Sequence, residues 1–270
     1  MKKNLITVII LSLVLVISLN GFASADDVKQ NIIQKNISTL DETAGVPTWN
    51  LGDNWTYNGY LRQDFGPLDL FNLKLSLEDL TFTVENNVGE SYQLSFEGFI
   101  KLGIGVGEGL ITISYGDIFG DLEVDKTEIG IMDFNIDFDG FGKLFLFKLP
   151  IGLILDTSCD KPLSPFEFPF TVGDSWNSTA IDFFYEITIN LFGGTKTNSN
   201  MISLPQAPLY CELKESVDVE AGTFQAYKIN LLDIVDIYYN VDVGNIIKIK
   251  TNDQFETTIL SIELSDTNII

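Results

Sequence analysis

The densest set of candidate metal ligands lies in one short run. Oxygen-bearing side chains occupy alternate positions and a glycine follows them: Asp133, Asn135, Asp137, Asp139 and Gly140. Hard oxygen ligands in this order resemble the opening of a calcium loop, but the position expected to hold a bidentate glutamate is Leu146. Because side chains two apart share one face of a strand, the run predicts a solvent-facing strand surface. Weak surface binding of calcium is the alternative, and no other cofactor is predicted.

Histidine is absent from all 270 residues. This excludes Ser-His-Asp and Cys-His nucleophiles and histidine-ligated zinc. A carboxylate pair could still form a glycosidase site, but the 38 acidic residues make pairs unavoidable and the sequence places none at a catalytic separation. We therefore predict a protein that is not an enzyme.

The first 25 residues have the order of a secretory signal. Two lysines precede an apolar run from Leu5 to Leu19, and the small residues Ala23-Ser24-Ala25 follow it. The apolar run is shorter than the ~20 residues that span a bilayer, which favours cleavage after Ala25. The sequence thus predicts an extracellular or cell-surface protein, with a retained N-terminal anchor as the alternative.

The formal charge is −22, and it becomes −24 when Lys2 and Lys3 leave with the signal. Such a surface repels phosphate groups, so neither nucleic acid nor electrostatic membrane binding is predicted.

Two further features fit an exported chain. Cys159 and Cys211 are the only cysteines, and an even pair outside the cytoplasm predicts one disulfide. Asn-x-Ser/Thr sequons begin at Asn36, Asn54 and Asn177 and are candidates for glycosylation. Burial of Asn54 among its aromatic neighbours is an alternative for that sequon.

Period-two alternation dominates the chain after the signal. The apolar residues of one segment share one parity: Leu209, Cys211, Leu213, Val217 and Val219. Polar residues from Glu212 to Glu220 share the other parity, and Glu215 suggests a bend or bulge. Gly, Asn and Asp punctuate such runs about every ten residues, which is typical of antiparallel hairpins. We predict an all-β protein, with residues 26–45 as a polar leader or short amphipathic helix.

One short pattern occurs twice. WNLGDNW, residues 49–55, is matched at a constant offset by FTVGDSW, residues 170–176. A turn that needs glycine, an aspartate that holds it and an inward tryptophan would explain the pattern. The repeated positions are Gly52, Asp53 and Trp55, then Gly173, Asp174 and Trp176. The repeat predicts two related antiparallel modules, residues 46–165 and 166–270, arranged as a curved sheet, half-barrel or sandwich.

The segments FPFTVGDSW, VEAGTFQAYKI and IYYNVDVGNIIKI carry a resemblance to a known group. They are similar to β-rich exported bacterial and archaeal proteins of mostly unassigned function. Their order also resembles lipoprotein-carrier half-barrels of the LolA and LppX type. The resemblance implies a curved sheet that shelters a lipid.

The run FGKLFLFKLPIGLIL, residues 141–155, is apolar on both strand faces apart from two lysines. Such a strand belongs either to a plain core or to the wall of an apolar cavity. The candidate cavity-lining residues are Phe141, Leu144, Phe145, Phe147, Ile151 and Ile154. We accordingly predict a binding protein for an apolar molecule or lipid. The alternative is a structural or adhesive protein that contacts other envelope proteins and has no cavity.

Overall fold

The computed structural model describes residues 43–269, except for 66–70, 88, 107–108, 145–146, 192 and 253–257. The predicted signal, most of the predicted leader and the Asn36 sequon lie outside the described residues. Within the described part, no helix has the length and apolar character needed to cross a membrane.

The described chain forms a single antiparallel sheet with fourteen strands. The first predicted module contributes β1 (Asn54–Phe65), β2 (Phe71–Asn86), β3 (Ser91–Val106), β4 (Gly109–Asp125), β5 (Ile131–Leu144) and β6 (Phe147–Leu163). The second contributes β7 (Ser175–Asn177), β8 (Ile181–Leu191), β9 (Gly194–Leu204), β10 (Pro208–Val219), β11 (Gly222–Leu231), β12 (Val235–Asn240), β13 (Asn245–Thr251) and β14 (Thr258–Thr267). The all-β prediction is confirmed.

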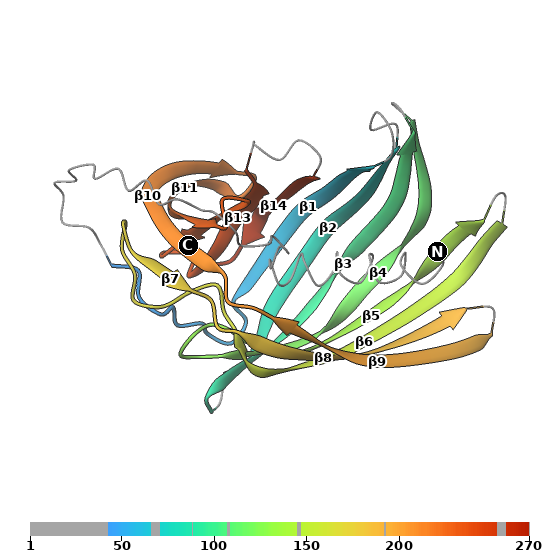
Figure 1. Cartoon of the computed structure of the whole chain (residues 1–270), viewed down its shortest axis with the longest axis horizontal. Coiled ribbons are helices and arrows are strands. Elements are labelled where there is room, and N and C mark those ends of the chain that lie inside the picture. Colours follow the sequence, from blue (N-terminus) through green and yellow to red (C-terminus); the bar gives the residue numbers. More distant parts are fainter. Residues whose placement is uncertain are drawn as a thin grey trace.

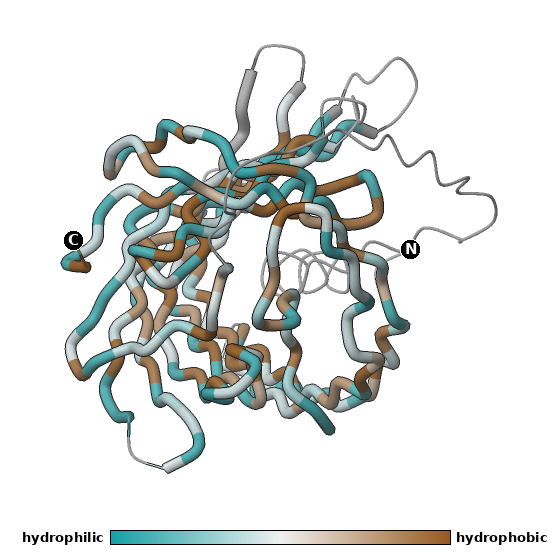
Figure 2. The backbone as a smooth tube through the Cα atoms, turned by 90° about the vertical axis from the view of Figure 1, so that its left-hand side faces the viewer, coloured by the Kyte–Doolittle hydropathy of each residue, from teal (hydrophilic) through white to brown (hydrophobic). Residues whose placement is uncertain are grey.

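The sheet is open and strongly curved (Figures 1 and 2). Its strand order is β7-β10-β11-β12-β13-β14-β1-β2-β3-β4-β5-β6-β8-β9. The long strands β1–β6 form a trough, and β10–β14 curl over one end of it (Figure 1). The two parts join where β14 pairs with β1, from Trp55 opposite Thr267 to Gln63 opposite Thr258. Of the predicted arrangements, the curved sheet is therefore the one observed.

The main core lies on the concave side, where alternate side chains of the long strands point. On β5, Phe134 and Ile136 are buried, while Asp133 faces solvent. On β4, Ile118 and Leu122 are buried, whereas Phe119 remains 45% exposed on the convex face. Period-two alternation thus assigns one face of each long strand to the core.

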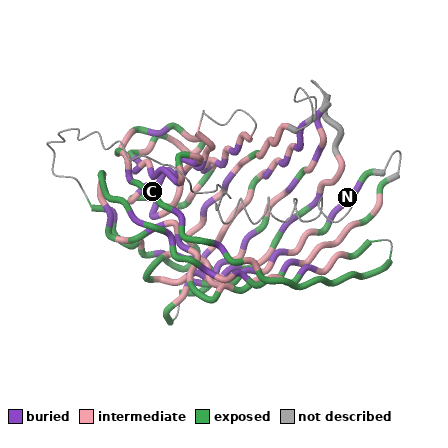
Figure 3. The backbone as a smooth tube through the Cα atoms, viewed as in Figure 1, coloured by how far each residue is buried: buried purple, intermediate pink, exposed green. Residues whose placement is uncertain are grey.

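Burial differs sharply between strands (Figure 3). All six residues of β12 are buried, because the curled end of the sheet covers both faces of this strand. In β9, by contrast, the first eight residues are exposed. β9 is the last strand in the order and pairs only with β8. A strand with one paired edge and two solvated faces is held mainly by backbone hydrogen bonds.

The two repeated patterns fold into the same turn. Gly52 and Gly173 have φ angles of 87° and 97°, a region that L side chains rarely adopt. The Asp53 carboxylate accepts a hydrogen bond from the backbone N–H of Asn50 at 2.6 Å. The corresponding bond runs from the Thr171 amide to Asp174 at 2.8 Å.

The tryptophans that follow the turns are core residues. Trp55 is fully buried and Trp176 is 8% exposed. The Trp176 indole N–H donates to the carbonyl oxygen of Pro165 at 3.1 Å. The prediction of a turn held by an aspartate hydrogen bond and followed by an inward tryptophan is confirmed. The repeated pattern forms part of the fold.

Candidate functional site

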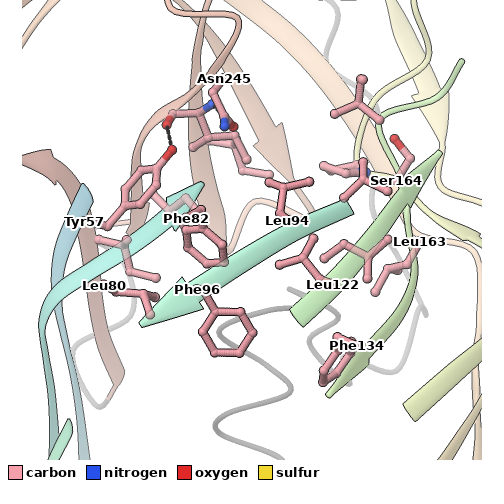
Figure 4. Close-up of a pocket in the computed structure, with 18 of the residues that line it drawn as sticks. Tyr57, Leu80, Phe82, Leu94, Phe96, Leu122, Phe134, Leu163, Ser164 and Asn245 are labelled. Atoms are coloured by element: carbon pink, nitrogen blue, oxygen red, sulfur yellow. Dashed lines mark hydrogen bonds between the residues drawn. The ribbon is translucent and has the colours of Figure 1, made fainter. Parts of the chain in front are cut away.

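A cavity of about 270 Å³ lies between the trough and the curled end of the sheet. Concave side chains of β2–β5 form one wall, including Leu80, Phe82, Leu94, Phe96 and Phe134 (Figure 4). Strands β10–β14 form the opposite wall, with Leu209, Leu231, Ile237, Ile249 and Ile262. Neither predicted module could enclose this space alone, because each supplies only one side of it.

The end of β6 and the segment that follows it contribute a further part of the lining. Leu163, Ser164, Pro165 and Phe166 border the cavity. The Ser164 hydroxyl fixes this segment by donating to the Glu128 carbonyl oxygen at 2.6 Å. It also accepts a bond from the Phe166 amide at 3.0 Å. The Ser164 hydroxyl thus joins this proline-containing loop to the turn between β4 and β5. The loop bridges the two walls of the cavity.

Polar side chains are few among the described residues that line the cavity. Asn245 lies beside the Tyr57 hydroxyl at one end of the site, Ser164 lies on the other side of it (Figure 4), and Ser178 also contributes to the lining. The Tyr57 hydroxyl donates to the carbonyl oxygen of Ile246 at 2.8 Å. Burial raises the pKa of Tyr57 well above its ordinary value, since a phenolate would lose its hydration there. The site is therefore an apolar chamber with a neutral polar end.

The predicted cavity-lining residues lie elsewhere on the sheet. Phe141 is 44% exposed on the convex face, and Ile154 shares that face with its partner Asp137. Ile151 points to the concave side beside Gly142, but it does not border the cavity. The side chains of Leu144, Phe145 and Phe147 lie outside the described residues. The structure does not bring the three described candidates together at the cavity.

The residues that do line the cavity carry a weak sequence signal. Leu94, Phe96, Leu122 and Phe134 each belong to an alternating strand, which predicts a buried face but not what lies against it. The opposing wall begins at Leu209, which is 75 residues after Phe134 in the chain. The two walls face each other through long-range contacts, chiefly the pairing of β14 with β1.

The acidic run lies along β5 as predicted for a strand surface. Asp133 stands opposite Glu123, and Asp139 stands opposite Asp117 on β4. Burial and the neighbouring Glu123 raise the pKa of Asp133. No group of three or more potential metal ligands occurs within the described ranges. The strand-face interpretation is confirmed, and weak calcium binding stays a prediction.

The predicted disulfide is wrong, because Cys159 and Cys211 are not bonded to each other. Their strands, β6 and β10, lie near opposite ends of the sheet order. Cys211 is fully buried, and its amide and carbonyl both pair with the second turn. Burial, together with Asp133 and Asp160, raises the pKa of the Cys159 thiol to about 12. This thiol stays protonated near neutral pH and is a poor nucleophile.

The two described sequons differ in exposure. Asn177 is exposed at the end of β7, whereas Asn54 is partly buried at the start of β1. The backbone N–H of Asn54 donates to the side-chain oxygen of Asn268 at 2.9 Å. Of the two, Asn177 offers the more accessible side chain, and glycosylation of either stays a prediction.

Comparison with known protein families, with curated proteins and with solved structures finds no match to this chain. The geometry of the cavity is therefore the main observation from which a function is proposed.

Proposed function

We propose that this protein is an exported, non-catalytic binding protein that holds a lipid or another apolar small molecule in the cavity between its two walls. The observation that carries the proposal is the lining, which is aliphatic and aromatic apart from a few polar groups. Apolar lining with a few placed polar groups is the usual character of small-molecule sites.

The size of the cavity supports a small or single-chain ligand. Its volume of about 270 Å³ exceeds that of an apolar cavity of ~150 Å³ that binds benzene. It lies near the lower end of ligand pockets, which begin at roughly 300 Å³. One chain of a lipid fits this range better than a complete two-chain lipid.

The proposed location and lack of catalysis rest on the sequence. An N-terminal segment with the order of a secretory signal supports export. Among the described residues that line the cavity, there is no histidine, carboxylate, lysine or cysteine. These features support storage or transfer of a ligand over its chemical conversion.

A second function, that of a structural or adhesive envelope protein, is favoured by β9. Its exposed residues and unpaired edge within the described sheet could extend onto a strand of another protein. This alternative does not require an occupied cavity, so ligand binding distinguishes the two.

Binding can be tested with diphenylhexatriene, an uncharged fluorophore that brightens in apolar surroundings. The wild-type protein should bind it saturably, because apolar surface is removed from water on both partners. In Leu122→Trp the larger ring would fill the cavity, and affinity should fall at least ~10-fold, the ratio that corresponds to ~1.4 kcal/mol.

Met201→Trp is the matched control, since it adds the same ring on the exposed strand β9 and should bind the fluorophore like wild type. Leu80→Trp, on another part of the wall, replaces Leu122→Trp if that variant fails to fold. Absence of saturable binding to wild type would overturn the proposal and favour the structural alternative.

A further inference from the structure

The described residues that line the cavity include no charged side chain. Aspartate, glutamate, lysine and arginine are all missing from these 27 residues, although charged residues make up 20% of the chain. Exposed charges are abundant on the convex face, as at Asp139 and Lys143. Charged side chains are thus kept away from the cavity. A charged ligand group placed there would find no opposite charge to pair with.

The surroundings also disfavour an unpaired anion. Tyr57 borders the cavity, and burial alone raises the pKa of its hydroxyl, which means that negative charge at this position is poorly solvated. The same desolvation would act on a carboxylate or phosphate that entered beside it. Such a group would have to become neutral by protonation before it entered the cavity.

The polar end of the cavity suits a neutral group instead. Asn245 uses its side-chain oxygen to accept the Ile246 amide at 2.8 Å, and its NH₂ group has no hydrogen-bond partner among the described residues. The Ser178 hydroxyl oxygen accepts the Ala207 amide at 2.9 Å, which leaves its proton to be donated. Both residues can therefore donate to a ligand oxygen that carries no charge.

From this lining we propose that the ligand is an uncharged amphiphile, an alkyl or isoprenoid chain that ends in an alcohol, ester or carbonyl group. Its chain lies against the apolar walls, and its oxygen accepts a hydrogen bond from Asn245. Ionised fatty acids and phosphate-bearing lipid headgroups are excluded. This assignment rests on the proposed function, because it specifies the ligand of the same cavity.

The test compares two ligands of equal chain length, dodecanol and dodecanoic acid, as competitors of diphenylhexatriene. Dodecanol should displace the fluorophore equally well from about pH 5 to about pH 9, since it does not ionise in that range. The acid should compete only as its neutral form. Its apparent Kd should therefore rise about 10-fold for each pH unit above the pKa of its carboxyl group.

The variant Asn245→Leu tests the polar end directly. Loss of one hydrogen bond should weaken dodecanol about 3- to 10-fold and leave dodecane, which has no oxygen, unchanged. Asn198→Leu on the exposed part of β9 is the control and should leave both affinities unchanged. An equal loss for dodecanol and dodecane would mean that Asn245 acts only through packing, which would overturn its assigned role.

The outcomes separate the two proposals. If dodecanoate at about pH 8 binds as tightly as dodecanol, the cavity accepts anions and the inference about charge is overturned, while the proposed function stands. If wild-type protein binds neither ligand nor the fluorophore, the proposed function fails as well.

Discussion

The two Gly-Asp turns are nearly identical, but the strands that follow them differ. In the first turn, the Gly52 amide donates to Val84 at 2.9 Å, and in the second the Gly173 amide donates to Cys211 at 2.8 Å. β1 then continues for 12 residues between β14 and β2, whereas β7 ends after 3 residues and pairs only with β10. A local pattern thus fixes a turn, while neighbouring strands determine how far the next strand extends.

The tryptophans should show the largest difference between the two copies. Trp55→Ala removes a fully buried ring at the junction of β14, β1 and β2, and should cost about 4 kcal/mol in the free energy of unfolding. Trp176→Ala should cost about 2 kcal/mol, because the short edge strand β7 can open locally. Chemical denaturation measures both, and equal losses would contradict the asymmetry.

The glycines should show no such difference. Nothing lies within 4 Å of a Cβ added at Gly52 or Gly173, so each substitution by alanine would be disfavoured by the backbone alone. With φ near 90° at both positions, Gly52→Ala and Gly173→Ala should each cost about 1–2 kcal/mol. Unfolding curves that differ by more than about 1 kcal/mol would show that the turns are not energetically equivalent.

Substitution of the two turn aspartates should have a smaller effect on the free energy of unfolding. Asp53→Ala and Asp174→Ala each remove an acceptor from one turn amide, and should each cost about 1 kcal/mol. Asparagine retains a side-chain oxygen and should restore most of this loss at either position. Failure of asparagine to rescue would assign the effect to the negative charge instead of the hydrogen bond.

Cys211 should be the most tolerant position. Its backbone pairs with the second turn as that of Val84 pairs with the first, and both side chains are buried. Cys211→Val should therefore change the free energy of unfolding by less than about 1 kcal/mol. As a check on the missing disulfide, denatured and unreduced wild type should titrate two thiols, and a single disulfide would leave none.

Sequence periodicity was sufficient for most of the local structure. Alternation assigned Leu213 to the buried face of β10, but this side chain is 38% exposed because the register shifts between Cys211 and Leu213. It placed Leu209, Cys211 and Val217 on the buried face correctly, and the repeated Gly-Asp pattern placed both turns. These features depend on contacts that are close in sequence or on the fixed geometry of a strand. They could be found without knowledge of the sheet order.

The cavity depended on information that periodicity lacks. Alternation shows that Leu122 and Phe134 share a buried face, but it does not show that Ile237 and Ile262 lie opposite them. The same limit produced the wrong disulfide, since burial of Cys211 says nothing about its distance from Cys159. The many apolar residues of 141–155 led to the prediction that this run lines a cavity. Enclosure of the observed cavity depends instead on how β10–β14 curl over the trough.

The most direct measurement of the central claim is native mass spectrometry of the protein after incubation with dodecanol. The wild type should retain one molecule of the alcohol, Leu122→Trp should retain none, and Met201→Trp should behave like wild type. Retention by Leu122→Trp at the wild-type level, or no retention by wild type, would contradict binding in the cavity between the two walls.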